Sequence, residues 1–599
     1  MFTDLLDYLA YLGRYPAAIF FLAAALILFF RAASSLRVRF QHQSTPVKGF
    51  FLIASDESGE RVQSFPLFHT SSLGRALSSD ICLNGRYILR HHAQIYLFNR
   101  RWYISRVSAD ADVRVNGRKI TGKHLLKHED RILLPGCEFT FIDERSSAEE
   151  IGVDFEATWT REQELFDEDA RGSRGAWFCF SFFYFLIYAQ LLLLLPGEPA
   201  SLKMMAASFG GSYYILLFLF GQIWSRLFDH FDLHIYYVLA LLSGLGLIFQ
   251  MRLSLLNRTK PVDWSMERWL RFLQSDLIKV VIFYFVGLAL LPLLISLISR
   301  THFLEKMAPL CVVLTPALYL VTRFLGSDTA GTGARLWLIL PGGFSLQLTE
   351  FAKISYLIVL AWFFMIRPPL RHQWLFALWA GINFMLMLWM PDLGSMMLLL
   401  PVTLLVFTVM TSEYIKTAII LSGGIGIFAL AYRILPYVRS RIHGWLTLWT
   451  EVNAQNDQII RGLQAMAQGG LFGLGLGRAE PRAIPLASSD MIFSFLCEEL
   501  GLLSGIALVM AFVVIWLRAA YAVTRIRDGF SCGLILAVSS AFFVEAAVVI
   551  GGCSGLIPLT GATLPFISRG GSSMMAKWIL AGILLGLGNR REEERYKSQ

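Results

Sequence analysis

The chain has 599 residues, of which 55% are hydrophobic and only 16% charged, whereas soluble domains carry about 25% charged residues. This composition excludes a single soluble globule, and seven cysteines without a C-x-x-C pair exclude a disulfide scaffold. Residues 31–175 hold 21 basic and 20 acidic side chains, so the net charge of +9 belongs mostly to the apolar remainder, where positively charged loops account for it and no nucleic-acid partner is expected.

The first apolar stretch covers about residues 15–30. Asp4 and Asp7 precede it, and Arg31, Arg37 and Arg39 follow it. Because Lys and Arg concentrate on the cytoplasmic side of membrane helices, the sequence predicts that residues 1–31 form a retained anchor entering the cytoplasm at its C-terminal end.

A soluble segment follows at 48–145. Short runs of alternating apolar and polar residues are separated there by turn residues, which predicts an all-β sandwich. The runs are FFLIAS, HAQIYLF, WYISRV, VRVNG, RILLPG and EFTFI.

Four elements of this segment occur in the order LGRALSSDICLN, ILRHHAQI, VRVNGRKI and LLKHEDRILLPGCEFTFI. In this order they resemble the forkhead-associated (FHA) domain. The resemblance implies binding of phosphothreonine proteins through Arg75 and Asn116, with Leu89 standing where the family has a serine that binds phosphate. Two interpretations stay open: phosphothreonine binding through Arg75 and Asn116, or phosphate-independent docking, with Asn116 and Gly117 forming only a tight turn.

Residues 146–175 are strongly acidic and predict a solvated linker. Beyond it, stretches of about 20 apolar residues recur, each long enough to span a bilayer. Together with the anchor they give about thirteen spans: two additional helices within 176–225, and a core at 232–591. The spans after the linker are expected near 176–196, 207–225, 232–250, 277–298, 304–324, 351–367, 372–390, 393–411, 415–435, 492–517, 529–551 and 575–588.

Counting spans from the anchor places the sandwich in the cytoplasm and the loop at 436–490 outside, in a multi-pass protein of a bacterial cytoplasmic membrane. Arginines at 367, 371, 518, 525, 527, 590 and 591 then lie inside, as expected. The loop at 251–276 disagrees, because it should lie outside yet carries five basic residues: Arg252, Arg258, Lys260, Arg268 and Arg271.

Ordered motifs run through the core from about Asp232 to Arg591. They are FDLHIYYVLALLSGLGLI, GTGARLWLILPGGFSLQLTEFAK, MPDLGS, PYVRSRIHGWL, NDQIIRGLQAMAQGGLFGLGLG, IPLASSDMIFSFLCEELGLLSG and GLIPLTGATLPFISRGGSSM. The region resembles the ten-span SEDS family, which includes FtsW, RodA and SpoVE. The resemblance implies a peptidoglycan glycosyltransferase that polymerises lipid II onto an undecaprenyl-linked glycan strand at the outer face of the membrane, releasing undecaprenyl pyrophosphate.

Joining two sugars requires a base, and Asp490 is the candidate, because a carboxylate at a membrane border is costly unless it is used or paired. The resemblance implies the same role, although Leu486 and Ser488 replace the family's Glu and His. The alternative is that Asp490 only caps a helix N-terminus.

Cations would hold the departing diphosphate. Arg439 and Arg441 match the paired arginines of the family, and Arg569 adds a third charge. Glu350 and Lys353, one turn apart, form either a local salt bridge or part of the cavity. Asp392 is either an N-cap or a substrate contact. The remaining predicted substrate contacts are Gln458, Ser572 and Ser573, the last two in a polar, glycine-containing segment expected to line a cavity.

The glycine-rich run at 469–477 lacks the G-K-[ST] of a phosphate loop. His and Cys residues show no metal-ligand spacing, so no cofactor is assigned, although a divalent cation, Mg²⁺ or Mn²⁺, could bridge Asp490 or Asp392 to the diphosphate. No Ser-x-x-Lys element occurs, and the resemblance implies a class B penicillin-binding protein as the transpeptidase partner. Two other functions stay open: a lipid II flippase, or an inactive scaffold of a cell-wall synthesis complex.

Overall fold

A computed structural model describes most of the chain as two compact units, residues 34–167 and residues 1–33 together with 168–599. The described residues are 18–29, 32, 46–55, 61–68, 70–74, 80–83, 87–89, 92–98, 101–106, 111–120, 122–143, 184, 200–228, 231–256, 276–327, 335–340, 344–365, 370–411, 413–453, 456–480, 483–523, 526 and 528–589.

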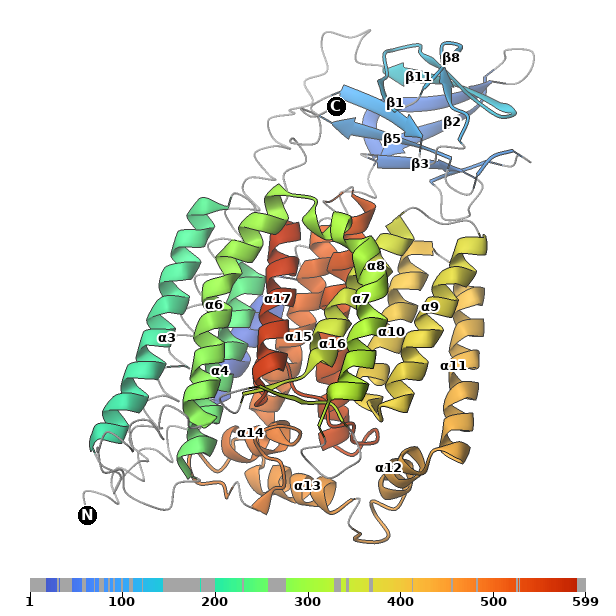
Figure 1. Cartoon of the computed structure of the whole chain (residues 1–599). Coiled ribbons are helices and arrows are strands. Elements are labelled where there is room, and N and C mark those ends of the chain that lie inside the picture. Colours follow the sequence, from blue (N-terminus) through green and yellow to red (C-terminus); the bar gives the residue numbers. More distant parts are fainter. Residues whose placement is uncertain are drawn as a thin grey trace. The chain divides into compact units, whose positions relative to one another are not determined.

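The smaller unit is a sandwich of two sheets (Figure 1). One sheet has the order β2-β1-β11-β10-β7-β8, and the other has the order β4-β3-β5-β6-β9. The strands are β1 (Pro46–Ser55), β2 (Arg61–Phe68), β3 (Thr70–Gly74), β4 (Ile81–Cys82), β5 (Ala93–Phe98), β6 (Arg101–Arg106), β7 (Arg114–Val115), β8 (Arg118–Lys119), β9 (Lys123–Leu125), β10 (Arg131–Leu134) and β11 (Cys137–Asp143). The predicted all-β sandwich is confirmed.

Every second residue of the strands points inward, and these residues form the core of this sandwich. Phe50 on β1 and Phe141 on β11 are fully buried and meet Trp102 of the facing sheet, with the Phe50 and Trp102 ring centroids 5.0 Å apart. Residues i and i+2 of a strand share a face, so Leu52 and Phe139 extend the same apolar layer.

The larger unit is a bundle of long helices (Figure 1). They are α3 (Ala200–Leu227), α4 (Leu233–Leu256), α6 (Asp276–Arg300), α7 (Phe303–Leu325), α8 (Leu348–Met365), α9 (Leu370–Trp389), α10 (Leu393–Thr411), α11 (Tyr414–Ile434), α15 (Leu502–Val523), α16 (Gly529–Cys553) and α17 (Gly571–Gly588). Within the described residues, eight helices are long and apolar enough to cross a membrane. The expected span at 176–196 lies almost wholly outside the described residues, and the total of thirteen stays a prediction.

Burial separates central from peripheral helices. The span of α4 is 94% buried inside the protein, whereas that of α11 is only 6% buried. A helix that is apolar on all sides needs no polar partner on any face. We therefore place α11 at the periphery of the bundle and α4, α16 and α17 at its centre.

The expected single span at 492–517 is wrong, because the helix breaks at Gly501 into α14 (Ile492–Leu500) and α15. Gly501 has φ +84, and a Cβ there would lie 2.3 Å from the Leu471 carbonyl oxygen. The glycine-rich run packs against this break: Leu502 N donates to the Gly470 carbonyl at 2.9 Å. Its glycines therefore serve close backbone packing.

The predicted outer loop at 436–490 contains two helices, α12 (Pro436–Leu446) and α13 (Asp457–Gly469). They lie with α14 at one end of the bundle, the lower end in Figure 1. A short hairpin, β12 (Leu338–Leu340) and β13 (Phe344–Leu346), also belongs to this unit. Asp490 sits in a turn directly before α14, at the end of the segment 470–491 that follows α13.

Arg252, near the end of α4, forms a buried ion pair with Glu499 of α14, with Nε and Oε1 3.4 Å apart. The Glu499 carboxylate also accepts a bond from Gly477 N at 3.0 Å. Arg252 is thus buried in an ion pair inside the protein, and the orientation of the chain in the membrane stays a prediction. The other basic residues of the 251–276 loop lie outside the described residues.

Candidate active site

Asp490 lies against the segment that joins α16 to α17. A Cβ built on Gly561 would be 3.4 Å from Asp490 Oδ2, and Cys553 Sγ lies 3.2 Å from the Asp490 carbonyl oxygen. The N-cap of α14 is Met491, which makes no side-chain cap bond. Asp490 is therefore not that helix's cap, and the alternative interpretation of this residue is not supported.

Burial raises the pKa of Asp490 above its ordinary value, while Ser489 and Arg441 act in the opposite direction. A carboxyl group in such surroundings holds its proton more tightly than an aspartate in water. As a base it would accept a proton more readily, which is what general-base chemistry near neutral pH requires.

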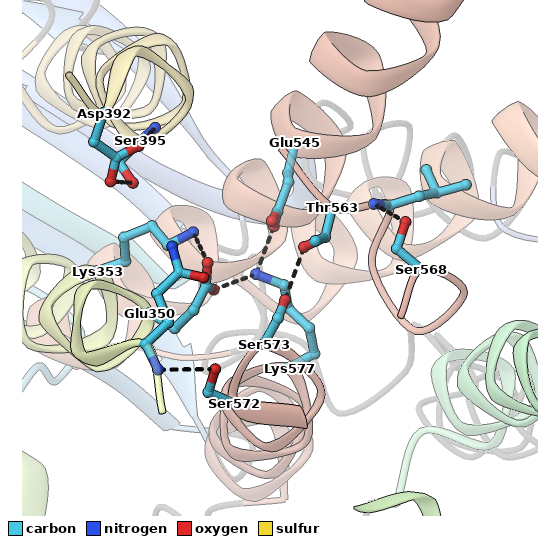
Figure 2. Close-up of polar contacts among 12 residues, drawn as sticks. Glu350, Lys353, Asp392, Ser395, Glu545, Thr563, Ser568, Ser572, Ser573 and Lys577 are labelled. Carbon is cyan, nitrogen blue, oxygen red and sulfur yellow. Dashed lines mark hydrogen bonds and ion pairs between the residues drawn. The ribbon is translucent and has the colours of Figure 1, made fainter. Parts of the chain in front are cut away.

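The chain before Asp490 is bonded to the turn at 564–569. Arg569 N donates to the Ser488 carbonyl at 2.7 Å, and Ser568 Oγ donates to the Ser489 carbonyl at 2.8 Å. Within the turn, Leu564 N donates to Ser568 Oγ at 2.8 Å (Figure 2). Residues 488–490 and 564–569, about 80 residues apart in sequence, are thus bonded together, and we call them the site wall.

Of the paired arginines Arg439 and Arg441, the structure brings only Arg441 to this wall. Arg441 donates to the carbonyl oxygens of Thr560 at 2.9 Å and Leu559 at 3.4 Å, next in sequence to Gly561, which Asp490 faces. Arg439 is exposed and donates to the Arg433 carbonyl at 2.6 Å. Val438, buried against Leu393 at the start of α10, anchors α12 in this position.

A cavity of about 40 Å³ opens beside the same segment, and Gly561 belongs to its lining. Glu350, Lys353 and Asp392 line it together with Glu545. Lys353 Nζ lies 2.6 Å from Glu350 Oε1, and Lys577 Nζ lies 3.2 Å from Glu350 Oε2 (Figure 2). Glu350 and Lys353 are thus both a local salt bridge and part of the cavity.

Glu545 and Lys577 were not predicted as site residues. They lie inside α16 and α17, 2.8 Å apart and each about 2% exposed. An ionisable residue in the middle of an apolar span is costly and marks a functional site by default. That rule, applied to each span, would have identified both.

The other predicted contacts lie at the same end of the bundle. Asp392 caps α10, accepting from Ser395 N at 3.0 Å and from Ser395 Oγ at 2.7 Å (Figure 2), so it is an N-cap that also lines the cavity. Ser572 Oγ accepts from Gln347 N at 3.2 Å, and Ser573 Oγ bonds to Thr563 Oγ1 at 2.8 Å.

Two further predicted contacts flank the Asp490 loop. Gln458 Nε2 approaches the Pro485 carbonyl at 3.5 Å. Arg569 has an exposed side chain, while its backbone is held by the bond to Ser488.

In the sandwich, Arg75 lies outside the described residues. Asn116 has φ +50 in the β7–β8 turn. Its amide donates to Asp130 Oδ1 at 2.8 Å and accepts from Arg131 N at 2.9 Å. Leu89 packs against the core of the sandwich. Both polar atoms of Asn116 therefore stabilise a turn within the domain.

Among the described residues, no group of three or more His, Cys, Asp or Glu side chains is placed to hold a metal ion. The carboxylates at the cavity are engaged by lysines or by Ser395. A metal at this site stays a sequence-based hypothesis.

Comparisons with known proteins identify the family of both parts of the chain. The family model described as cell cycle protein, covering FtsW, RodA and SpoVE, matches residues 232–593. The chain belongs to the FtsW/RodA/SpoVE family. The FHA domain model matches residues 71–135, so this FtsW/RodA/SpoVE protein also carries an FHA domain.

The peptidoglycan glycosyltransferase RodA of Mycobacterium tuberculosis is 30% identical over 424 residues, covering 67% of this chain and 87% of the relative. Stage V sporulation protein E of Bacillus subtilis is 31% identical over 273 residues, covering 44% of this chain and 73% of the relative. A chain from a solved peptidoglycan synthase complex shares the fold, with a TM-score of 0.50, 21% identity and coverage of 61% of this chain and 99% of that chain.

Proposed function

We propose that this member of the FtsW/RodA/SpoVE family is a peptidoglycan glycosyltransferase that polymerises lipid II. The observation that carries the proposal is the position of Asp490: partly buried, not used as a helix cap, and facing the same segment that Arg441 binds. A base and a cation on one wall are the two groups that glycosyl transfer from a diphosphate donor requires.

In this mechanism Asp490 takes the proton of the 4-hydroxyl of the acceptor lipid II. The hydroxyl oxygen attacks the anomeric carbon of the donor glycan strand, and the bond from that carbon to the diphosphate breaks. Undecaprenyl pyrophosphate leaves with the bonding electron pair. Arg441 would stabilise the charge that develops on the diphosphate.

The polymerisation of lipid II by wild type and by Asp490→Asn tests the proposal. General base catalysis contributes about 10²–10⁴-fold, so the variant should lose at least about two orders of magnitude in rate. Equal rates would remove Asp490 as the base. Lipid II translocation without polymerisation by either protein would favour the flippase, and no activity with a partner present would favour the scaffold.

We further propose that the protein is a multi-pass protein of a bacterial cytoplasmic membrane, with the 436–490 loop outside and the FHA domain in the cytoplasm. A class B penicillin-binding protein would supply crosslinking. The solved complex named above is described as coordinating polymerization and crosslinking in a peptidoglycan synthase, which supports such a partnership for this chain.

For the FHA domain we propose docking of a partner protein. The internal bonds of Asn116 favour the phosphate-independent form, whereas Arg75 keeps the phosphothreonine-dependent form open. The two forms are distinguished by titrating phosphothreonine peptides and their unphosphorylated counterparts against the full chain and its Arg75→Ala variant. Equal affinity for both kinds of peptide, unchanged by the variant, selects the phosphate-independent form.

A further inference from the structure

Gln250, near the end of α4, bonds with its side chain to both segments of the site wall. Its Nε2 donates to the Ser488 carbonyl at 2.9 Å and to the Ile567 carbonyl at 2.9 Å. The side chain is 1% exposed. An amide buried in an apolar helix is costly unless its hydrogen bonds are made. The buried amide of Gln250 therefore needs both carbonyls as acceptors.

The two carbonyls belong to the segments that carry the chemistry. Ser488 lies two residues before Asp490, and Ile567 lies in the turn bonded to Ser488 through Arg569 N. The Ser488 carbonyl therefore accepts two bonds, one from the turn and one from α4. Gln250 thereby bonds the loop of Asp490 to α4, which is the most buried of the eight spanning helices among the described residues.

We propose that Gln250 is a positioning residue that fixes the Asp490 carboxylate relative to the 564–569 turn. The proposal rests on the proposed function, in which Asp490 is the base. A base must stay within hydrogen-bond reach of the hydroxyl it deprotonates, and a displacement of about 1 Å can cost about 10²-fold in rate. Gln250 acts on the orientation of the base and does not touch substrate.

The experiment measures lipid II polymerisation by the full chain carrying Gln250→Met, which keeps the side-chain length and removes both bonds. We expect kcat to fall by about 10²-fold, with a much smaller change in KM. The acidic limb of the kcat–pH profile should also move to lower pH, because a loosened loop hydrates Asp490 and lowers its pKa toward the ordinary value.

Tyr284→Phe is the matched control. Tyr284 on α6 is buried, and its hydroxyl donates to the Phe566 carbonyl of the same turn at 2.8 Å, but no bond links it to Ser488 among the contacts of the described residues. The control should lower thermal stability to a similar extent and leave the kcat–pH profile in place. Similar kcat and pH profiles in both variants would overturn the inference.

If Gln250→Met does not fold, Ser568→Ala provides the second test, because it removes the parallel bond to the Ser489 carbonyl. It should reproduce the loss of kcat and the shift in pH profile, and a wild-type profile in Ser568→Ala would count against the inference. Asp490→Asn, assayed alongside, distinguishes failure of the proposed function from failure of the inference about Gln250. Wild-type activity of Asp490→Asn would reject the base and the inference together, whereas an inactive Asp490→Asn with a control-like Gln250→Met would reject the inference alone.

Discussion

At the scale of single residues, Asp490 combines burial with a neighbouring cation. Burial favours its protonated form, and Arg441 favours its ionised form. The resulting pKa lies above the ordinary 3.8, so the net effect of the site is to make the carboxylate a stronger base.

This shift predicts the pH dependence of activity. The base must be ionised, so the polymerisation rate should fall as pH decreases through the raised pKa, with an acidic midpoint above the ordinary 3.8 of an aspartate. A kcat–pH profile between about pH 3 and 8 measures it. An acidic midpoint at or below the ordinary value would contradict the assignment.

The same shift has a consequence for stability. Because the pKa in the folded state exceeds that in the unfolded state, the carboxyl group stabilises the fold only when protonated, and this contribution is lost as pH rises through the folded pKa. Asp490→Asn, which stays neutral, should therefore be no less stable than wild type at pH 7. Thermal unfolding of both proteins checks that the loss of activity in this variant is not a loss of fold.

At the scale of elements, the break between α14 and α15 places the Asp490 loop. The glycine-rich run enters the gap at Gly501, with Gly473 N 2.4 Å from the position where a Cβ would stand. A continuous helix would leave no room for that run. The ion pair between Arg252 and Glu499 fixes the short helix to α4.

Gly501→Ala should therefore destabilise the bundle by at least about 2 kcal/mol, because the alanine requires both a positive φ and space already filled by backbone. Polymerisation should fall with it, since α14 follows Asp490 directly. Gly381→Ala is the control: it lies inside α9 with nothing within 4 Å of the new Cβ, and a Gly→Ala change there should gain up to about 1 kcal/mol. Similar unfolding temperatures for the two variants would refute the packing argument.

At the scale of the whole molecule, the chain divides into two compact units with separate hydrophobic cores. The core of the FHA unit consists of strand residues such as Phe50 and Phe141, whereas the core of the larger unit consists of helix residues such as Tyr284 and Trp578. The unfolding transition of each unit should therefore change with substitutions in that unit and not with substitutions in the other.

Asn116→Ala tests this independence. It removes two hydrogen bonds and leaves an alanine at positive φ, so the FHA unit should lose about 1–3 kcal/mol. The unfolding transition of the helical unit and the polymerisation rate should stay unchanged. Calorimetry of the full chain measures both transitions, with the exposed Arg118→Ala in the same hairpin as control. A shift of both transitions would show that the units are coupled.

Predictions from local pattern agree well with the structure. The span expected at 393–411 is α10 with the same bounds, because a long apolar run needs only its own backbone bonds to form a helix in a membrane. The six expected strand segments each contain a strand. The helix break at Gly501 within the expected span 492–517 was missed, because the backbone that packs against this glycine belongs to another segment, residues 471–473.

The sequence by itself determined the two-part architecture, the family motifs and the identity of the candidate base, because hydrophobic period and motif order are local properties. Only the tertiary structure decided which charges meet: Arg441 reaches the wall and Arg439 does not, Glu545 pairs with Lys577, and Gln250 bridges Ser488 and Ile567. These partners lie up to 317 residues apart. Contacts over such separations follow from the packing of helices against each other, which no local pattern records.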